Sequence, residues 1–164
     1  MKRLSRFSKI SACMVLALVL MLTPMAAFAE GGTASKSKTV PKTPPPPMMV
    51  QPLGLYTGYT YLESSFRSII DNQNETCQLQ AQTQASQDVD TIGAKFQLQR
   101  WTGTYWLSVG PESNFSESDT SVFFGGVTKT TTSGYYYRGY ITHYVSHNGT
   151  NESAVEYTAT MLAD

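Results

Sequence analysis

Residues 75–100 read ETCQLQAQTQASQDVDTIGAKFQLQR, and two alternating patterns in this stretch decide the fold class. In Glu75–Ala85 and again in Thr91–Arg100, apolar residues alternate with polar residues, most of which are glutamine. The apolar members are Cys77, Leu79, Ala81, Ile92, Ala94, Phe96 and Leu98. A period of two over this length is typical of strands that bury one face. The stretch therefore predicts two half-buried strands, with Cys77 buried and slow to react.

The chain around this stretch, residues 54–164, is predicted to form a single all-β domain. Its abundant Thr, Tyr, Val and Ile favour strands. Further strands are predicted at Leu55–Leu62, Ser65–Asp71, Tyr105–Val109, Ser121–Thr131, Tyr135–Ser146 and Asn151–Leu162. About seven short strands with regular turn signals indicate an antiparallel, immunoglobulin-like β-sandwich. Leu62–Ile70 also fits one face of a helix, so strand and helix both remain open there.

The last two predicted strands flank Asn148-Gly149, and the length of that turn sets their register. A three-residue loop places Ile141 opposite Val155 and leaves Glu152 and Glu156 on the outer face. A two-residue turn would bring both glutamates onto the core face, where unpaired acids are costly to bury. We therefore predict the three-residue loop.

The closing hairpin also carries a resemblance to known modules. Gly134-Tyr135-Tyr136-Tyr137-Arg138 precedes a Thr/His/Val strand, an Asn-Gly turn and a Glu/Ser/Thr strand, which resembles the last hairpin of immunoglobulin-like and fibronectin type III-like domains. With Leu98-Gln99-Arg100 ahead of Trp106, residues 55–162 resemble small, uncharacterised secreted β-sandwich proteins of Gram-positive bacteria. The resemblance implies no activity and no catalytic residue. The cysteine pair of true immunoglobulin domains is absent.

Residues 1–29 are predicted to be a secretory signal peptide. Four basic residues precede the apolar run Ala12–Leu22, and Ala27-Phe28-Ala29 supplies small residues before a cleavage site at Glu30. A membrane span needs about 20 apolar residues, so we expect no membrane anchor after cleavage. The protein is thus expected to be secreted and extracellular.

Residues 30–53 are predicted to be a flexible, Pro-rich linker that contains the run Pro44-Pro45-Pro46-Pro47. The predicted mature chain has 8 basic and 12 acidic residues, a net charge of −4, which argues against a nucleic-acid partner. Cys77 is its single cysteine, so no intramolecular disulfide forms.

The sequence offers no pattern for catalysis, for a metal or for a cofactor. A nucleophilic triad needs Ser or Cys beside His with an acid behind it. The two histidines, His143 and His147, lie four residues apart at one predicted strand edge near the last turn, roughly 13 Å from each other. No nucleophile-elbow pattern or metal-ligand spacing surrounds them. We therefore predict that the protein is not an enzyme.

Aromatic rings supply the candidate binding residues, which are Trp101, Tyr105, Trp106, Tyr136, Arg138, Tyr140 and Tyr144. Flat rings on a rigid sheet stack on sugar rings or anchor a protein partner. The alternative is that half of these rings serve core or cross-strand packing. Arg138 is expected to pair with Glu156 on the neighbouring strand.

A second candidate binding surface is a Gln-rich face, formed by Gln78, Gln80, Gln82, Gln84, Gln97 and Gln99. It is interpreted either as a surface that hydrogen-bonds an extended polymer or as an uncharged solvated face. Together these features predict a secreted, non-enzymatic binding or adhesion module whose partner is a cell-surface glycan or protein. The alternative is a small secreted toxin or bacteriocin-like effector.

Overall fold

The computed structural model describes residues 39–50 and 54–164. The predicted signal peptide and residues 30–38 and 51–53 of the predicted linker lie outside the described residues. The described residues belong to one compact unit. In the described part of the chain, no helix has the length and apolar character needed to cross a membrane.

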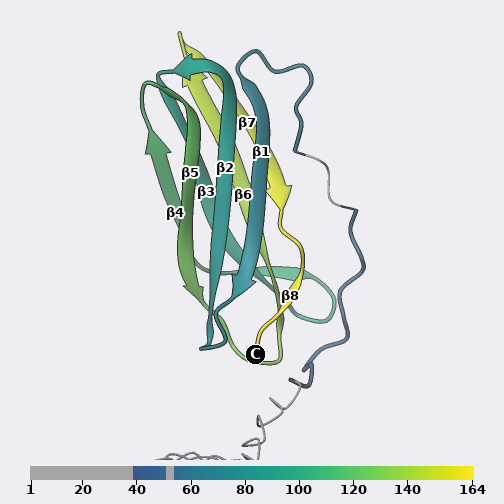
Figure 1. Cartoon of the computed structure of the whole chain (residues 1–164). Coiled ribbons are helices and arrows are strands. Elements are labelled where there is room, and N and C mark those ends of the chain that lie inside the picture. Colours follow the sequence, from purple (N-terminus) through teal and green to yellow (C-terminus); the bar gives the residue numbers. More distant parts are fainter. Residues whose placement is uncertain (1–38, 51–53) are drawn as a thin grey trace, which may run out of the picture. The chain divides into compact units, whose positions relative to one another are not determined.

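Eight antiparallel strands make two sheets that pack face to face (Figure 1). The strands are β1 (Leu62–Asp71), β2 (Thr76–Val89), β3 (Thr91–Trp101), β4 (Trp106–Glu117), β5 (Thr120–Thr130), β6 (Tyr136–His147), β7 (Thr150–Tyr157) and β8 (Met161–Leu162). The first sheet has the order β1-β2-β5 and the second has the order β4-β3-β6-β7, with β8 paired to β6. The predicted all-β sandwich of antiparallel sheets is confirmed.

The two alternating patterns form β2 and β3, each an interior strand of its own sheet. Their apolar residues all point into the space between the sheets, and Cys77 is fully buried there as predicted. The core residues with the lowest exposure include Cys77, Leu79, Ala81, Ile92, Ala94, Phe96, Leu98, Tyr137, Ile141 and Val145. One side of β2 and of β3 thus packs in the core, and the opposite side forms part of the outer face of its sheet.

The open question at Leu62–Ile70 is resolved as a strand, because β1 pairs with β2 along its whole length apart from one irregularity near Leu62. The predicted strand Leu55–Leu62 does not form; only Leu55 makes an isolated bridge, to Ser64. Conversely, β4 is longer than the predicted Tyr105–Val109 and continues through a bulge.

The last hairpin has the register that the sequence argument rejected. Its turn has two residues, Asn148 (φ 49°) and Gly149 (φ 78°), both in the left-handed region, as a type I′ turn requires. Ile141 consequently lies opposite Glu156. Val155, predicted to be in the core, is 46% exposed. The predicted three-residue loop is therefore wrong.

The rejected register is stable because neither glutamate is buried without a partner. Glu156, which is 3% exposed, forms an ion pair of 2.9 Å with Arg67 of β1. Glu152 accepts hydrogen bonds from the backbone N–H groups of Thr60, Tyr61 and Leu62. Charge pairing and hydrogen bonding offset the desolvation that made the two-residue turn look unfavourable.

Candidate functional site

Four of the seven candidate binding residues form a stacked row on the outer face of the second sheet. The ring centroids of Trp101 and Trp106 lie 5.3 Å apart, as expected for a cross-strand pair of β3 and β4. The Arg138 guanidinium lies 4.4 Å from the Trp106 ring and 3.9 Å from the Tyr157 ring. Tyr140 then meets Tyr157 edge to face at 5.5 Å. We call these five residues the aromatic row.

The other three candidates lie outside the aromatic row. Tyr105 is 59% exposed beside the β3–β4 turn. Tyr136 pairs with Leu162 of β8. Tyr144 donates a hydrogen bond of 2.8 Å to Oδ1 of Asn114. The sequence thus correctly predicted which face of β6 carries its candidates. It did not show which of the seven candidates stack on one another.

Arg138 does not pair with Glu156, so that expectation is wrong. Its Nε donates a hydrogen bond of 2.8 Å to Oε1 of Gln99, and burial lowers the pKa of the guanidinium. Glu156 faces the interior and pairs with Arg67 instead. The charge of Arg138 is held between two aromatic faces, which attract a cation through their quadrupoles.

Part of the predicted linker covers the aromatic row. Nε1 of Trp101 donates a hydrogen bond of 3.0 Å to the Pro44 carbonyl, and Nη1 of Arg138 lies 3.0 Å from Sδ of Met49. Trp101 is only 7% exposed as a result of its packing. The Lys42 backbone N–H also donates to the Gly134 carbonyl at 2.8 Å. Residues 42–49 are thus tied to the folded unit.

The outer face of the first sheet presents a different surface, which we call the glutamine face. It consists of the residues that alternate with the core positions of β1, β2 and β5: Ser64, Phe66, Ser68, Ile70, Gln78, Gln80, Gln82, Gln84, Val122, Phe124, Gly126 and Thr128. None of them carries a charge. Phe66, Gln82 and Phe124 lie side by side in one cross-strand row, and the two rings are 54% and 62% exposed.

The glutamine face was only partly foreseen from the sequence. The six glutamines were expected on one face, but Gln97 and Gln99 lie on the outer face of the second sheet. The exposed rings of Phe66 and Phe124 were missed. For Phe124 the signal was hidden, because Phe123 beside it is buried and only the register of β5 shows which of the two rings points outward.

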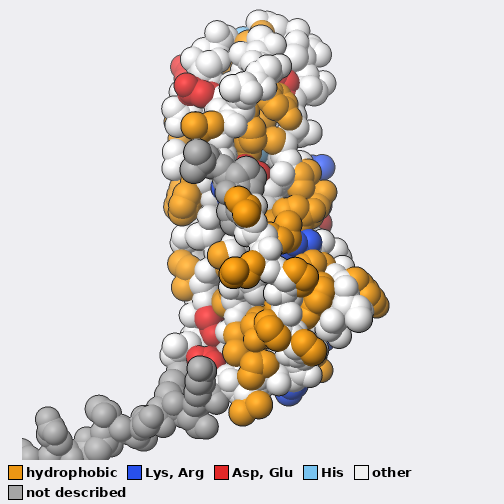
Figure 2. Space-filling model, turned by 90° about the vertical axis from the view of Figure 1, so that its right-hand side faces the viewer, with side chains coloured by type: hydrophobic (Ala, Val, Ile, Leu, Met, Phe, Trp, Pro, Cys, Tyr) orange, Lys and Arg blue, Asp and Glu red, His pale blue; other side chains and the backbone are white. Residues whose placement is uncertain are grey.

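Hydrophobic side chains also gather in patches on the side of the domain seen in Figure 2. Large exposed apolar residues in the described segment before β1 are Val40, Met48, Met49, Val50, Leu55 and Tyr59. Patches of this kind on a small domain are typical of contact surfaces.

The interior holds one buried histidine. Nδ1 of His143 lies 2.8 Å from the Thr83 hydroxyl, and Nε2 has no hydrogen-bond partner among the described residues. Burial, with a further contribution from the charge of Arg67, lowers the pKa of His143 to about 4. His147 instead contacts Asp90 at the surface end of β6.

The described residues include no group of His, Cys, Asp and Glu side chains arranged to hold a metal ion. The lowered pKa of His143 keeps its imidazole neutral at pH 7. Comparison with known proteins found no matching family model, curated protein or solved structure.

Proposed function

We propose that the chain is a secreted, non-enzymatic, immunoglobulin-like binding module whose glutamine face docks an extended neutral glycan. The strand order supports the immunoglobulin-like part of the proposal. On this proposal β1, β2 and β5 take the places of strands A, B and E, and β4, β3, β6 and β7 take those of C′, C, F and G. Sandwiches of this kind commonly serve as presentation scaffolds at cell surfaces.

The observation that carries the binding proposal is the exposed pair Phe66 and Phe124 on either side of Gln82. Exposed aromatic rings on a sheet face are unfavourable in water and are typical of contact surfaces, and the exposed side chains of Ile70 and Val122 extend the apolar area of this face. The two rings are separated by two strand spacings, roughly 10 Å, a span that a short oligosaccharide bridges. Sugar rings stack on aromatic faces, and sugar hydroxyls pair with amides.

The twelve residues of the glutamine face are uncharged, which supports a neutral ligand; the Glu63 carboxylate borders the face at Gln84 and disfavours an anionic one. A polyanion is bound through Lys and Arg, and the twelve residues of this face include neither. Gln78 and Gln82 make no side-chain hydrogen bond to another described residue, so their amides are open to a ligand. The aromatic row is a weaker candidate, because its rings stack on one another and Trp101 is covered by Pro44.

A glycan array followed by calorimetric titration tests the proposal. The double variant F66S/F124S should keep the thermal stability nearly unchanged, because both rings are exposed, and should weaken glycan binding at least tenfold. The matched control Y140S/Y144S alters the outer face of the other sheet. Binding that survives F66S/F124S but is lost in Y140S/Y144S would move the site to the sequence-predicted residues. The absence of binding to any neutral glycan would refute the ligand class.

Secretion is tested separately by N-terminal sequencing of the protein from culture supernatant. We expect the mature protein to begin at Glu30. Recovery only from membranes at full length would contradict the signal-peptide proposal.

A further inference from the structure

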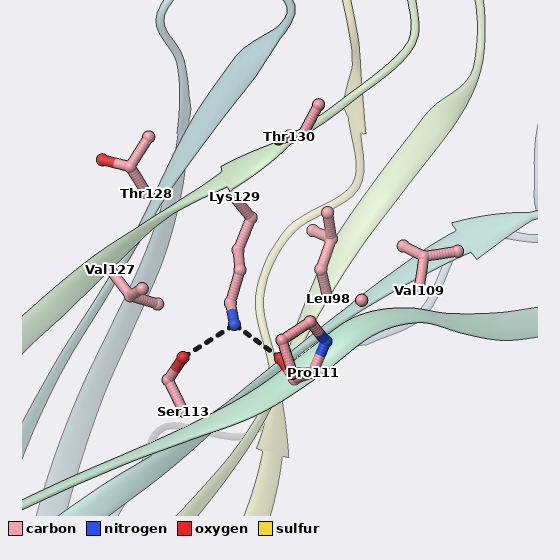
Figure 3. A pocket seen from close by; sticks show the side chains of 9 residues that line it. Leu98, Val109, Pro111, Ser113, Val127, Thr128, Lys129 and Thr130 are labelled. Atoms are coloured by element: carbon pink, nitrogen blue, oxygen red, sulfur yellow. Dashed lines mark hydrogen bonds between the residues drawn. The ribbon is translucent and has the colours of Figure 1, made fainter.

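A cleft opens between the edge strands of the two sheets, away from the Phe66 and Phe124 rings on which the proposed function rests. β4 and β5 are the terminal strands of their respective sheets. The cleft between them has a volume of about 410 Å³. Its lining includes Leu98, Val109, Pro111, Ser113, Val127 and Lys129 (Figure 3). Its volume lies in the range of small-molecule sites, which is about 300–1,000 Å³.

The local sequence explains why a cleft forms here. The pairing of β3 with β4 is interrupted between Phe96 and Leu98, so the partners jump from Ser113 to Val109. Gly110, in the left-handed region at φ 69°, starts the bulge. Gln97 holds the bulge by donating from Nε2 to the carbonyls of Val109 and Gly110. A bulge of this kind ends regular pairing and changes the course of an edge strand.

Lys129 places a cation inside this cleft. It lies on the core side of β5, opposite Cys77, and is 9% exposed. Its Nζ donates hydrogen bonds of 2.7 Å to the Pro111 carbonyl and 2.8 Å to the Ser113 hydroxyl, as Figure 3 shows. An ammonium group has three donors, so one remains after these two contacts.

Both partners of Lys129 are neutral. Among the described residues, no carboxylate oxygen lies within 4.0 Å of its ammonium group. Burial lowers the pKa of Lys129, while Cys77 and, on β4, Glu112 act in the opposite direction. A largely buried ammonium with no carboxylate in direct contact is unfavourable, and an anion that enters the cleft relieves that cost.

The walls of the cleft add a second requirement for the ligand, which is an apolar body. Leu98, Val109 and Val127 line it with aliphatic side chains beside the ammonium group. We propose that the cleft binds a small monocarboxylate with an apolar body, whose carboxylate accepts the remaining N–H of Lys129 and whose body packs on these three side chains. The proposal does not depend on Phe66 or Phe124 and stands apart from glycan binding.

Octanoate is a suitable probe, with octanol as the uncharged control of the same chain length. We expect octanoate to cause saturable NMR shifts in the backbone amides of Val109, Gly110, Glu112 and Ser113 and of residues 127–130. Octanol should bind at least tenfold more weakly, because it lacks the charge-assisted hydrogen bond to Lys129. Equal binding of the two compounds, or no saturable shift with octanoate, would overturn the proposal.

Two variants separate binding from a merely structural role of Lys129. Lys129→Met keeps an unbranched side chain of similar length and should reduce octanoate affinity at least tenfold. Lys95→Met, on the outer face of β3, removes the same charge elsewhere and should have no effect. Val127→Phe retains Lys129 but fills the cleft, so it should also block octanoate even if Lys129→Met fails to fold. Unchanged affinity in Lys129→Met or in Val127→Phe would refute the assignment.

Discussion

The buried imidazole of His143 should make the domain sensitive to acid. Its side chain is 0% exposed, and burial lowers its pKa to about 4 from 6.5. The charge of Arg67 acts in the same direction, although Glu156 partly offsets that charge. The folded state therefore takes up a proton at His143 only at a pH well below the one at which the unfolded chain does.

The direction of the effect follows from proton linkage. Above pH 6.5 both states carry neutral His143, and the full stability is present. As the pH falls from 6.5 towards 4, only the unfolded state binds the proton, so stability declines by about 1.4 kcal/mol per pH unit. The loss attributable to His143 reaches about 3 kcal/mol at pH 4. Because domains are stable by about 5–15 kcal/mol, this loss is large.

Urea unfolding monitored by tryptophan fluorescence at pH 7, 5.5 and 4 measures the loss. Carboxylates also take up protons in acid; desolvation raises the pKa of Glu152, but backbone hydrogen bonds lower it by more, so its protonation adds to the acid effect. The variant His143→Gln retains those carboxylates but does not titrate at this position. Its stability should therefore fall by about 3 kcal/mol less than that of the wild type between pH 7 and pH 4.

His147→Gln is the matched control, since it removes the other histidine and should retain the loss due to His143. An identical pH dependence of the wild type and His143→Gln would refute the reasoning. A direct NMR titration of the His143 ring that gives an ordinary histidine pKa would refute it as well.

Three further predictions concern the fold. Glu156→Ala should destabilise the domain by about 3–5 kcal/mol in urea unfolding, because it leaves the charge of Arg67 buried without its ion-pair partner; a cost below 1 kcal/mol would contradict the account of the last hairpin. Burial raises the pKa of the Cys77 thiol to about 11, so thiol labelling should be slow in the native protein and fast in denaturant. Rapid labelling of the native protein would mean that Cys77 lies on the outer face of β2. Deletion of residues 39–50 should expose Trp101 and shift tryptophan emission to longer wavelength, whereas an unchanged spectrum would argue against the contact with Pro44.

The sequence determined the strand character of the domain and the direction of its central side chains. In β2 and β3 the period of two was long enough to identify the core side, and Cys77 and Phe96 are buried accordingly. Strand periodicity is a local property, since successive side chains alternate between faces whatever the strand pairs with. The same reasoning correctly separated Tyr137 and Ile141 from Tyr140 on β6.

The tertiary structure alone decided the register of the last hairpin and the partners of each face. The choice between two turn lengths depended on the cost of burying Glu156, and that cost depended on Arg67, which lies far away in sequence on β1. The six glutamines divide between two faces because β2 and β3 belong to different sheets, although a single residue separates the strands in sequence. Local pattern specifies which side of a strand is apolar, but pairing between strands specifies which surfaces those sides build.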